Sequence, residues 1–415
     1  MTDGHDGGGV MSEPDLLIDV TRTVSRAGHR HYSGVDRVER AYIEQALKYS
    51  GNCYFLTHVL AGFAVLDRDG MRKFLDISDG NGKLDQPDLI SRVGRQNTAL
   101  RRSESTVRRL GTHIRGSGKL PLLLKGFLRQ GFWYLNVGHT NLRPAIQKAV
   151  RIGGAAKIAT LIHDIIPLQY PEFSRPGTLK TFTDRLDVAA EHSDLLIYNS
   201  SDTQLRTEAW LAENGYNVQG VAAPLGLHLP VSDAVEQQNT HPSFVVLGTI
   251  EPRKNHLLLL NIWRQFHEQM QPADIPHLHV VGRRGWENEN VLDVLERAPF
   301  MGESVFEHGY LSDDAMVKLI VNARALLFPS FAEGYGLPLA EALHLGKNVV
   351  CSDLPAFREI GGAARYLDPL DGPGWKDAIL SLMDENSNRN MTPDRPFVTP
   401  SWHDHFEVVM AALNN

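Results

Sequence analysis

Cysteine is scarce in this sequence. The 415 residues include only two cysteines, Cys53 and Cys351, and these lie far apart. This scarcity excludes a disulfide-rich scaffold and argues against a zinc site built from thiolates. Long apolar runs are missing as well. None approaches the roughly 20 residues that a helix needs to cross a bilayer, so the sequence predicts no transmembrane segment.

The sequence predicts neither a secretory leader nor a basic, nucleic-acid-binding protein. Residues 1–13 are rich in Gly and Asp and contain no basic region followed by an apolar one, so they predict a flexible tail rather than a signal peptide. The net charge of -7 argues against a general nucleic-acid-binding protein. We therefore expect a cytoplasmic protein with no nucleic-acid partner.

What the sequence does contain is two runs of alternating strands and helices, which predict an α/β fold with parallel doubly wound sheets. The first run gives a domain over 14–229 and the second a domain over 243–396. Residues 230–242 are polar and predict a linker. Residues 397–415 predict a closing C-terminal helix. We expect two Rossmann-like domains that face a central cleft.

A cationic loop follows the predicted strand 244–247. It covers residues 248–255 (GTIEPRKN) and leads directly into a helix. Ligands of doubly wound sheets bind beyond the carboxyl ends of the strands, and helix N-termini favour anions. Arg253 and Lys254 could therefore neutralise a diphosphate without a metal. The alternative is a solvated Arg-Lys pair on a surface turn.

A second loop, residues 329–338 (PSFAEGYGLP), follows the predicted strand 325–328. Its glycines would let the backbone approach a ligand closely. Glu333 and Glu341 could accept hydrogen bonds from sugar hydroxyls and from a ribose diol. Because carboxylates repel a diphosphate, we expect both to face the neutral ends of such a ligand. The alternative is one surface glutamate and one at a helix start.

These residues resemble a known family. The Glu-x7-Glu pattern from Glu333 to Glu341 looks like the signature of the family-4 retaining glycosyltransferases, which have the GT-B fold. Residues 248–255 are similar to that family's diphosphate loop. More narrowly, they resemble the bacterial mannosyltransferase branch that builds O-antigen and capsule polysaccharides. Residues 281–286 (VGRRGW) and 353–359 (DLPAFRE) extend the match over the second domain.

The resemblance implies roles for particular residues. Arg253 and Lys254 would grip the donor diphosphate, Glu333 would contact the transferred sugar, and Glu341 would hold the ribose. Backbone groups would hold the sugar and phosphates at Gly334, Tyr335, Gly336 and Leu337. Some relatives carry a further arginine where this chain has Gly248, which itself lies in the donor-binding loop. Arg253 would then supply the missing charge, with help from Arg283 or Arg284.

The first domain resembles the family more loosely. Residues 160–167 (TLIHDIIP) look like its His-Asp segment, in which His163 would contact a hydroxyl of the donor sugar. A structural histidine at a strand end is the alternative. Residues 33–37 (SGVDR) open the first helix and resemble the loop that faces the diphosphate, which makes Gly34 a donor-binding candidate.

The resemblance implies a retaining transfer by a front-side route, with no metal and no cofactor besides the nucleotide-sugar co-substrate. GDP-mannose is the favoured donor, and UDP-sugars or dTDP-sugars are alternatives. A glycan or a lipid-diphosphate-linked saccharide would be the acceptor. An epimerase or phosphorylase of the same fold would also be consistent with these residues, as would a non-catalytic sugar-nucleotide-binding protein. A metal-dependent transferase would use Asp67-Arg68-Asp69, which better fits a hairpin turn. An oxidoreductase lacks its glycine fingerprint.

Residues 67–131 match nothing specific and predict an acceptor-specific insertion. Glu104 is the only acid in its basic part, 92–129. We expect this part to contact an anionic membrane at its inner face, or to be a solvated, partly disordered face. The basic residues are Arg92, Arg95, Arg101, Arg102, Arg108, Arg109, Arg115, Lys119, Lys125 and Arg129.

Overall fold

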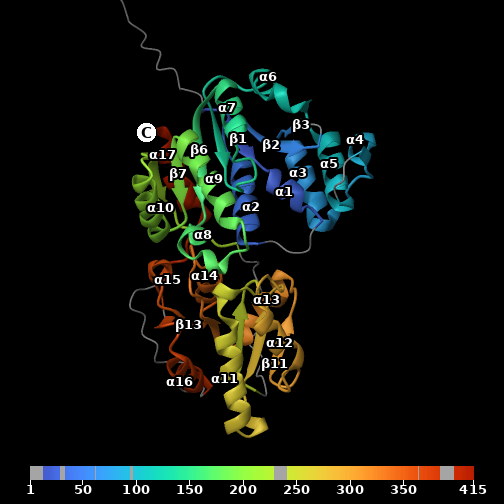
Figure 1. Ribbon diagram of the computed structural model, residues 1–415. Helices are drawn as coiled ribbons and strands as arrows, with labels where there is room; N and C mark the ends of the chain where they lie inside the picture. Colours follow the sequence, from blue (N-terminus) through green and yellow to red (C-terminus); the bar gives the residue numbers. More distant parts are fainter. Residues whose placement is uncertain are drawn as a thin grey trace, which may run out of the picture.

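The computed structural model describes residues 13–28, 33–60, 62–93, 97–228, 241–362, 364–383 and 397–415. Within these ranges the chain forms two α/β domains, each built on its own sheet (Figure 1). Nearly all of the predicted tail at 1–13 and of the predicted linker at 230–242 lies outside the described residues.

The N-terminal domain contains an eight-stranded sheet. Its order is β4-β3-β2-β1-β5-β6-β7-β8, and all neighbours are parallel except β2–β3 and β3–β4. Strands β1 and β5 are fully buried, as expected for parallel strands covered on both faces. The strands are β1 (Leu16–Asp19), β2 (Cys53–Val59), β3 (Gly62–Leu66), β4 (His113–Arg115), β5 (Phe132–Asn136), β6 (Ala155–Ile162), β7 (Leu195–Tyr198) and β8 (Gln219–Ala222).

Helices cover this sheet, and polar caps fix where several of them begin. Ser33 caps α2: its hydroxyl accepts from the Asp36 N–H, and the Asp36 carboxylate accepts from the Ser33 N–H. The helices are α1 (Thr21–Arg26), α2 (Gly34–Ala46), α3 (Arg68–Asp76), α4 (Leu89–Val93), α5 (Thr98–Leu110), α6 (Leu120–Lys125), α7 (Pro144–Ile152), α8 (Ile166–Gln169), α9 (Thr178–His192) and α10 (Ser201–Glu213).

The hairpin turn predicted at Asp67-Arg68-Asp69 is wrong. Asp67 caps helix α3, because its carboxylate accepts a hydrogen bond of 2.8 Å from the Gly70 N–H. The predicted insertion 67–131 continues as α4, α5 and α6, and its strand β4 extends the sheet at its edge. Its described part is therefore folded onto the N-terminal domain.

The C-terminal domain contains a six-stranded parallel sheet of order β11-β10-β9-β12-β13-β14. This is the 3-2-1-4-5-6 order of doubly wound folds, whose chain reverses direction between β9 and β12. The strands are β9 (Ser243–Leu247), β10 (His277–Val281), β11 (Val305–His308), β12 (Ala325–Phe328), β13 (Asn348–Ser352) and β14 (Ala364–Leu367). The helices are α11 (His256–Gln269), α12 (Glu289–Arg297), α13 (Asp313–Asn322), α14 (Leu337–His344), α15 (Pro355–Ile360) and α16 (Gly372–Met383).

The last helix, α17 (Trp402–Asn414), returns to the N-terminal domain and packs on α2, β7 and β8. The hydroxyl of Tyr42 lies 2.7 Å from Nε2 of His405, and both side chains are buried. Because this helix follows the C-terminal domain in sequence but packs on the N-terminal one, it joins the two domains a second time.

Loops at the carboxyl ends of strands from both sheets touch across the domain boundary. The hydroxyl of Ser200, which follows β7, donates to the Gly334 carbonyl at 2.8 Å. A Cβ atom on Gly334 would lie 2.2 Å from the His163 carbonyl oxygen, so only glycine fits this approach. The predicted fold class, two doubly wound domains that face each other, is confirmed.

Candidate functional site

The two loops singled out in the sequence start side by side. One follows β9 and the other follows β12, and these strands are neighbours at the point where the strand order reverses. Ligands of doubly wound folds bind in the crevice at this position. The backbone N–H of Phe331 donates to the Arg253 carbonyl at 2.8 Å, so the loops are hydrogen-bonded to each other. The topology therefore brings the predicted cations and the predicted carboxylate together.

Arg253, Lys254 and Glu333 form one buried charged cluster. Arg253 lies 2.7 Å from Oε2 of Glu333 and 2.6 Å from Oε1 of Glu251. Nζ of Lys254 contacts Oε1 of Glu333, which also accepts a hydrogen bond of 2.8 Å from Ser330. Two cations thus face two carboxylates. The sequence argument placed Glu333 at the neutral end of a ligand and did not consider pairing with the cations, whereas in the structure Glu333 pairs with both of them.

The electrostatics of Glu333 follow from this pairing. Burial acts to raise the pKa of its carboxyl, but the attraction of Arg253 and Lys254 outweighs burial and lowers the pKa to about 2. Glu333 is therefore ionised at neutral pH. An incoming anion would compete with it for the same two cations.

Gly248 makes room for Lys254. Its φ of 144° is one that L side chains rarely adopt, and a Cβ atom there would lie 3.2 Å from Cε of Lys254. This packing gives a physical reason for glycine at position 248.

A cavity of about 330 Å³ adjoins Gly248 and is lined by both domains. The N-terminal domain contributes Arg26, Ser33 and Arg37 to the cavity wall. The C-terminal domain contributes residues at or after the carboxyl ends of three adjacent strands, β9, β10 and β11: Leu247, Gly248, Thr249, Val281, Gly282, Arg283, Gly309, Tyr310, Leu311, Asp313 and Met316. Arg283 thus lies in the cavity wall.

Glu341 is held from across the domain boundary. The guanidinium of Arg37 on α2 lies 2.6 Å from Oε1 of Glu341 on α14. The Glu341 side chain is 2% exposed, and burial raises the pKa of its carboxyl while Arg37 opposes that shift. Glu341 therefore sits beside the cavity in an interdomain ion pair.

The N-terminal side of the cleft presents two histidines at the ends of β5 and β6. Nε2 of His163 donates to the Val137 carbonyl at 2.8 Å, and Nε2 of His139 donates to the Leu161 carbonyl. Their ring centroids are 5.2 Å apart. Because a carbonyl can only accept, each neutral ring carries its proton on Nε2 and leaves Nδ1 as an acceptor.

Both histidines are neutral at pH 7. Burial lowers the pKa of His163 to about 4 and that of His139 to about 3. His139 also has a positive φ of 59°, an uncommon backbone conformation for a residue other than glycine. These rings can therefore bind hydroxyl groups without adding charge to the cleft.

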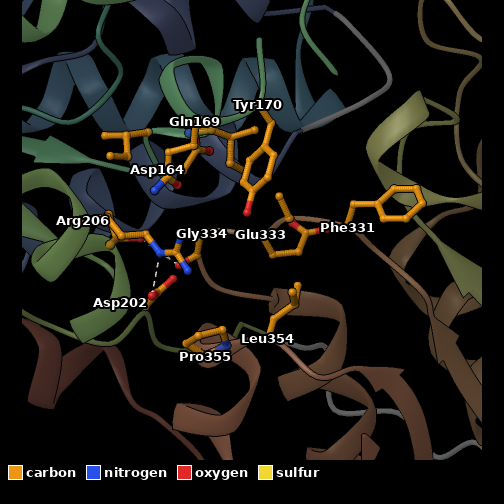
Figure 2. Close-up of a pocket in the computed structure, with 14 residues that line it drawn as sticks. Asp164, Gln169, Tyr170, Asp202, Arg206, Phe331, Glu333, Gly334, Leu354 and Pro355 are labelled. Atoms are coloured by element: carbon orange, nitrogen blue, oxygen red, sulfur yellow. Dashed lines mark hydrogen bonds and ion pairs between the residues drawn. The ribbon is translucent and has the colours of Figure 1, made fainter. Parts of the chain in front are cut away.

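A smaller cavity of about 30 Å³ opens between the domains next to Glu333. Figure 2 shows Asp164 and Tyr170 of the N-terminal domain opposite Glu333 and Gly334 of the C-terminal domain. Burial raises the pKa of Asp164, with Arg253 opposing the shift. A polar group that entered this cavity would lie next to Glu333.

Four of the remaining predicted residues serve the packing of the domains. Tyr335 is buried with the N-terminal core, and its hydroxyl donates to the Leu225 carbonyl at 2.9 Å. Leu337 packs on the same core and lies near Gly34, where a Cβ atom would be 3.8 Å from Cδ1 of Leu337. Gly336, at a φ of 117°, caps α14 and lies against Phe357.

Arg284 does not line the large cavity. Its guanidinium lies 2.8 Å from a carboxylate oxygen of Glu307 and also contacts Glu296. The structure therefore favours Arg283 over Arg284 as the additional cation.

Sequence reasoning missed several residues at this site, notably Arg37, His139, Tyr310 and Asp313. Arg37 was visible only as part of the 33–37 segment, and the position of His139 after β5 was the only available signal for it. Among the described residues, no group of three or more His, Cys, Asp and Glu side chains could hold a metal ion. Within the same residues, no helix is both long and apolar enough to cross a membrane.

Residues 232–392 match the family model described as glycosyl transferases group 1. The chain is also similar to the serotype-specific mannosyltransferase WbdA of Escherichia coli, with 33% identity over 249 residues. This match covers 55% of the chain and 30% of WbdA. The O-antigen chain mannosyltransferase B of Escherichia coli is 34% identical over 150 residues, which cover 36% of the chain and 39% of that protein. The chain therefore spans about a third of the length of these curated relatives.

Two solved structures share the fold over nearly the whole chain. A sucrose-phosphate synthase from Thermosynechococcus elongatus aligns with a TM-score of 0.61 at 14% identity, over 96% of this chain and 98% of that one. Anabaena HepE in complex with UDP-glucose aligns with a TM-score of 0.60 at 13% identity, over 97% and 98%. The chain therefore has the GT-B fold, and its residues 232–392 form a domain similar to the glycosyl transferases of group 1.

Proposed function

We propose that this protein is a retaining, metal-independent hexosyltransferase that moves a sugar from a nucleoside diphosphate donor to a saccharide acceptor. The observation that carries the proposal is the buried cluster of Arg253, Lys254 and Glu333 beside a two-domain cavity of about 330 Å³. That volume lies at the lower end of the range typical of small-molecule sites, about 300–1,000 Å³.

The donor diphosphate would bind at the charged cluster. Each cation already has a carboxylate partner. A diphosphate carries about two negative charges and would replace Glu333 as the partner of Arg253 and Lys254. The released Glu333 carboxylate would then accept hydrogen bonds from the donor sugar.

The nucleoside would occupy the large cavity. Glu341 would take the ribose diol, and Arg37, which already contacts Glu341, would join the N-terminal domain to the donor. Asp313 lines the cavity. Guanine presents two adjacent N–H groups to a carboxylate, whereas uracil presents one. This match, and the mannosyltransferase relatives, support GDP-mannose as the donor.

The acceptor would approach from the smaller cavity, between Asp164, Tyr170 and Glu333. Its hydroxyl would attack the anomeric carbon on the face from which the diphosphate leaves. The bond from that carbon to the phosphate oxygen breaks, and the acceptor's proton passes to this oxygen. The protein would position both partners and stabilise the charge that builds on the diphosphate. His139 and His163 would orient sugar hydroxyls through Nδ1.

The acceptor class follows from the relatives, which are named for O-antigen and serotype-specific mannosyl transfer. We propose a glycan or a lipid-linked saccharide in the synthesis of a cell-surface polysaccharide. We also propose peripheral contact with an anionic membrane, which rests on a different face of the molecule, described in the next subsection.

The test is a transfer assay with purified protein, a mannoside acceptor, and GDP-mannose, UDP-glucose or a dTDP-sugar as donor. We expect GDP release and a product with the α configuration of the donor by NMR, unchanged in the presence of a chelator. Transfer from a UDP-sugar alone would overturn the donor assignment, and a β-linked product would overturn retention. Tight nucleotide binding without transfer to any acceptor would favour a non-catalytic binding protein.

A further inference from the structure

One long stretch of the N-terminal domain contains no acidic residue. Between residues 105 and 163 the sequence has ten Lys and Arg and no Asp or Glu, although the whole chain has a net charge of -7. Carboxylates from elsewhere in the chain neutralise four of these cations: Arg108 pairs with Asp88, Arg109 with Asp85, Arg129 with Asp15, and Arg151 with Asp194. Part of the basic charge predicted at 92–129 is therefore neutralised by ion pairs within the protein. A contact with an external partner would depend on the cations that remain.

Helix α6 separates its apolar and basic residues onto two sides. Leu120, Leu123 and Leu124 follow the helical spacing of one face and are buried in the N-terminal core. Lys119, Leu122 and Lys125 recur every three residues on the opposite side and are exposed. Leu122 is 70% exposed. The solvent-exposed side of this helix therefore presents a leucine between two lysines.

Helix α7 adds a similar pair beside α6. Lys148 and Ile152 are four residues apart and share one side of the helix, and Ile152 is 60% exposed. The end of α7 lies against α6, since a Cβ atom on Gly153 would be 2.8 Å from Cδ1 of Leu124. Within the described part of the chain, none of Arg115, Lys119, Lys125 and Lys148 has a carboxylate partner.

We propose that this basic–apolar face, formed by Arg115, Lys119, Leu122, Lys125, Lys148 and Ile152, docks on an anionic membrane. The cations would meet acidic headgroups, and Leu122 and Ile152 would enter the boundary between headgroups and acyl chains. Large apolar side chains surrounded by unpaired charge of one sign fit a lipid surface because both parts of the contact are satisfied. The docking does not depend on the transfer reaction.

The position of this face bears on the acceptor. Figure 1 shows α6 and α7 at the end of the N-terminal domain that lies farthest from the C-terminal domain. Docking there would hold the cleft away from the lipid surface. It would suit an acceptor whose reactive end extends from the membrane, such as a growing saccharide.

The test is cosedimentation with vesicles of phosphatidylcholine, with and without phosphatidylglycerol, in the absence of donor and acceptor. We expect the protein to bind only the anionic vesicles, and less strongly as salt rises. Lys119→Glu/Lys125→Glu should reduce binding at least about 30-fold, which corresponds to about 1 kcal/mol for each lost cation. Leu122→Glu should reduce binding as well.

Two matched controls lie elsewhere on the surface. Lys318→Glu/Lys376→Glu makes the same change in net charge on the C-terminal domain, and Leu205→Glu replaces a leucine that is 71% exposed on α10. Both should bind vesicles as the unmodified protein does. All variants should keep the melting temperature and the response to nucleoside diphosphate, so that loss of docking and loss of the enzyme can be distinguished.

Equal binding to both kinds of vesicle, or to neither, would overturn the proposal. So would equal binding by Lys119→Glu/Lys125→Glu and its control. If the lysine substitutions weaken binding, Leu122→Glu has no effect, and soluble polyglutamate competes fully with vesicles, then the face serves an acidic protein and the membrane assignment fails.

Discussion

Across the cleft, Arg253 and Lys254 lie in ion pairs with Glu333, whereas His139 and His163 are neutral rings bonded to backbone carbonyls. Both sets of residues follow strands at the carboxyl edge of a doubly wound sheet. The residues after β9 and β12 thus pair through charge, whereas the two histidines after β5 and β6 form uncharged hydrogen bonds. This difference matches the two ends of a nucleotide sugar, an anionic diphosphate and a neutral ring of hydroxyls.

The energetics of the two sides differ as well. A buried ion pair is held mainly because breaking it leaves an uncompensated charge, which costs about 3–5 kcal/mol. A diphosphate can replace Glu333 because it brings compensating charge of its own. The histidines require no such exchange, since their Nδ1 atoms are already available as acceptors. Binding on the C-terminal side should therefore be sensitive to charge, and binding on the N-terminal side to shape and hydrogen bonding.

The largest effect is expected at the ionic side. Lys254→Ala and Glu333→Gln should each lower kcat at least about 100-fold, because Lys254 would stabilise the charge that builds on the diphosphate and Glu333 would position the donor sugar. Glu333→Gln should also destabilise the fold by about 3 kcal/mol, since Arg253 and Lys254 then lose a buried partner.

Turnover assays measure the expected loss of kcat, and urea denaturation measures the expected loss of stability. Arg284→Gln is the control, because Arg284 is a paired cation that does not line the large cavity. Near-normal turnover in both variants would mean that the cluster is structural only.

A smaller effect is expected for Arg37, which joins the N-terminal domain to Glu341 of the C-terminal domain. Arg37→Gln should raise the KM for the donor roughly fivefold to tenfold, because a partly exposed ion pair contributes about 1 kcal/mol. Arg40 lies one turn further along α2 and pairs with Glu44 and Asp79. Arg40→Gln should leave the donor KM unchanged. A similar change of KM in both variants would indicate a general effect on α2 rather than contact with the donor.

Recognition of the nucleotide base of the donor should depend on Asp313. Asp313→Asn replaces an acceptor by a group that can also donate, so GDP affinity should fall about tenfold, the effect of one hydrogen bond to a charged group. UDP affinity should change less. Calorimetric titration with both nucleotides gives the ratio directly, and an equal change for both would remove Asp313 from base recognition.

Because His163 is held neutral, it should affect how the stability of the fold depends on pH. The folded pKa of His163 is about 4, below its ordinary value of 6.5, so the unfolded chain takes up this proton first as the pH falls. The free energy of unfolding should therefore decrease from pH 6.5 toward pH 4. His163→Gln should make this decrease shallower, as measured by urea denaturation at pH 7 and pH 5. Parallel curves for the two proteins would show that His163 is not held neutral.

Part of the fold could be predicted from the sequence, because buried parallel strands are encoded as short apolar runs. Strand β12 has the bounds predicted for it, 325–328, since it is a continuous apolar run. Three strands were missed. β4 has only three residues, β8 is half-buried, and β3 precedes the acidic residues that suggested a turn.

The site was predictable only within one domain. The meeting of the loops after β9 and β12 follows from the strand order alone. The Arg37–Glu341 pair and the burial of Tyr335 in the N-terminal core depend on how two domains dock, and no local pattern encodes that. The pairing of Glu333 with both cations was also unexpected, because the sequence argument considered only repulsion from a ligand.

The central claim is that Lys254 and Arg253 bind a diphosphate beside the two-domain cavity. Calorimetric titration of GDP into the unmodified protein, Lys254→Ala and Arg284→Gln tests it most directly. We predict saturable binding to the unmodified protein and to Arg284→Gln, with affinity lowered at least about tenfold in Lys254→Ala, as expected for a lost charge-assisted hydrogen bond. Equal affinity in all three proteins would contradict the claim.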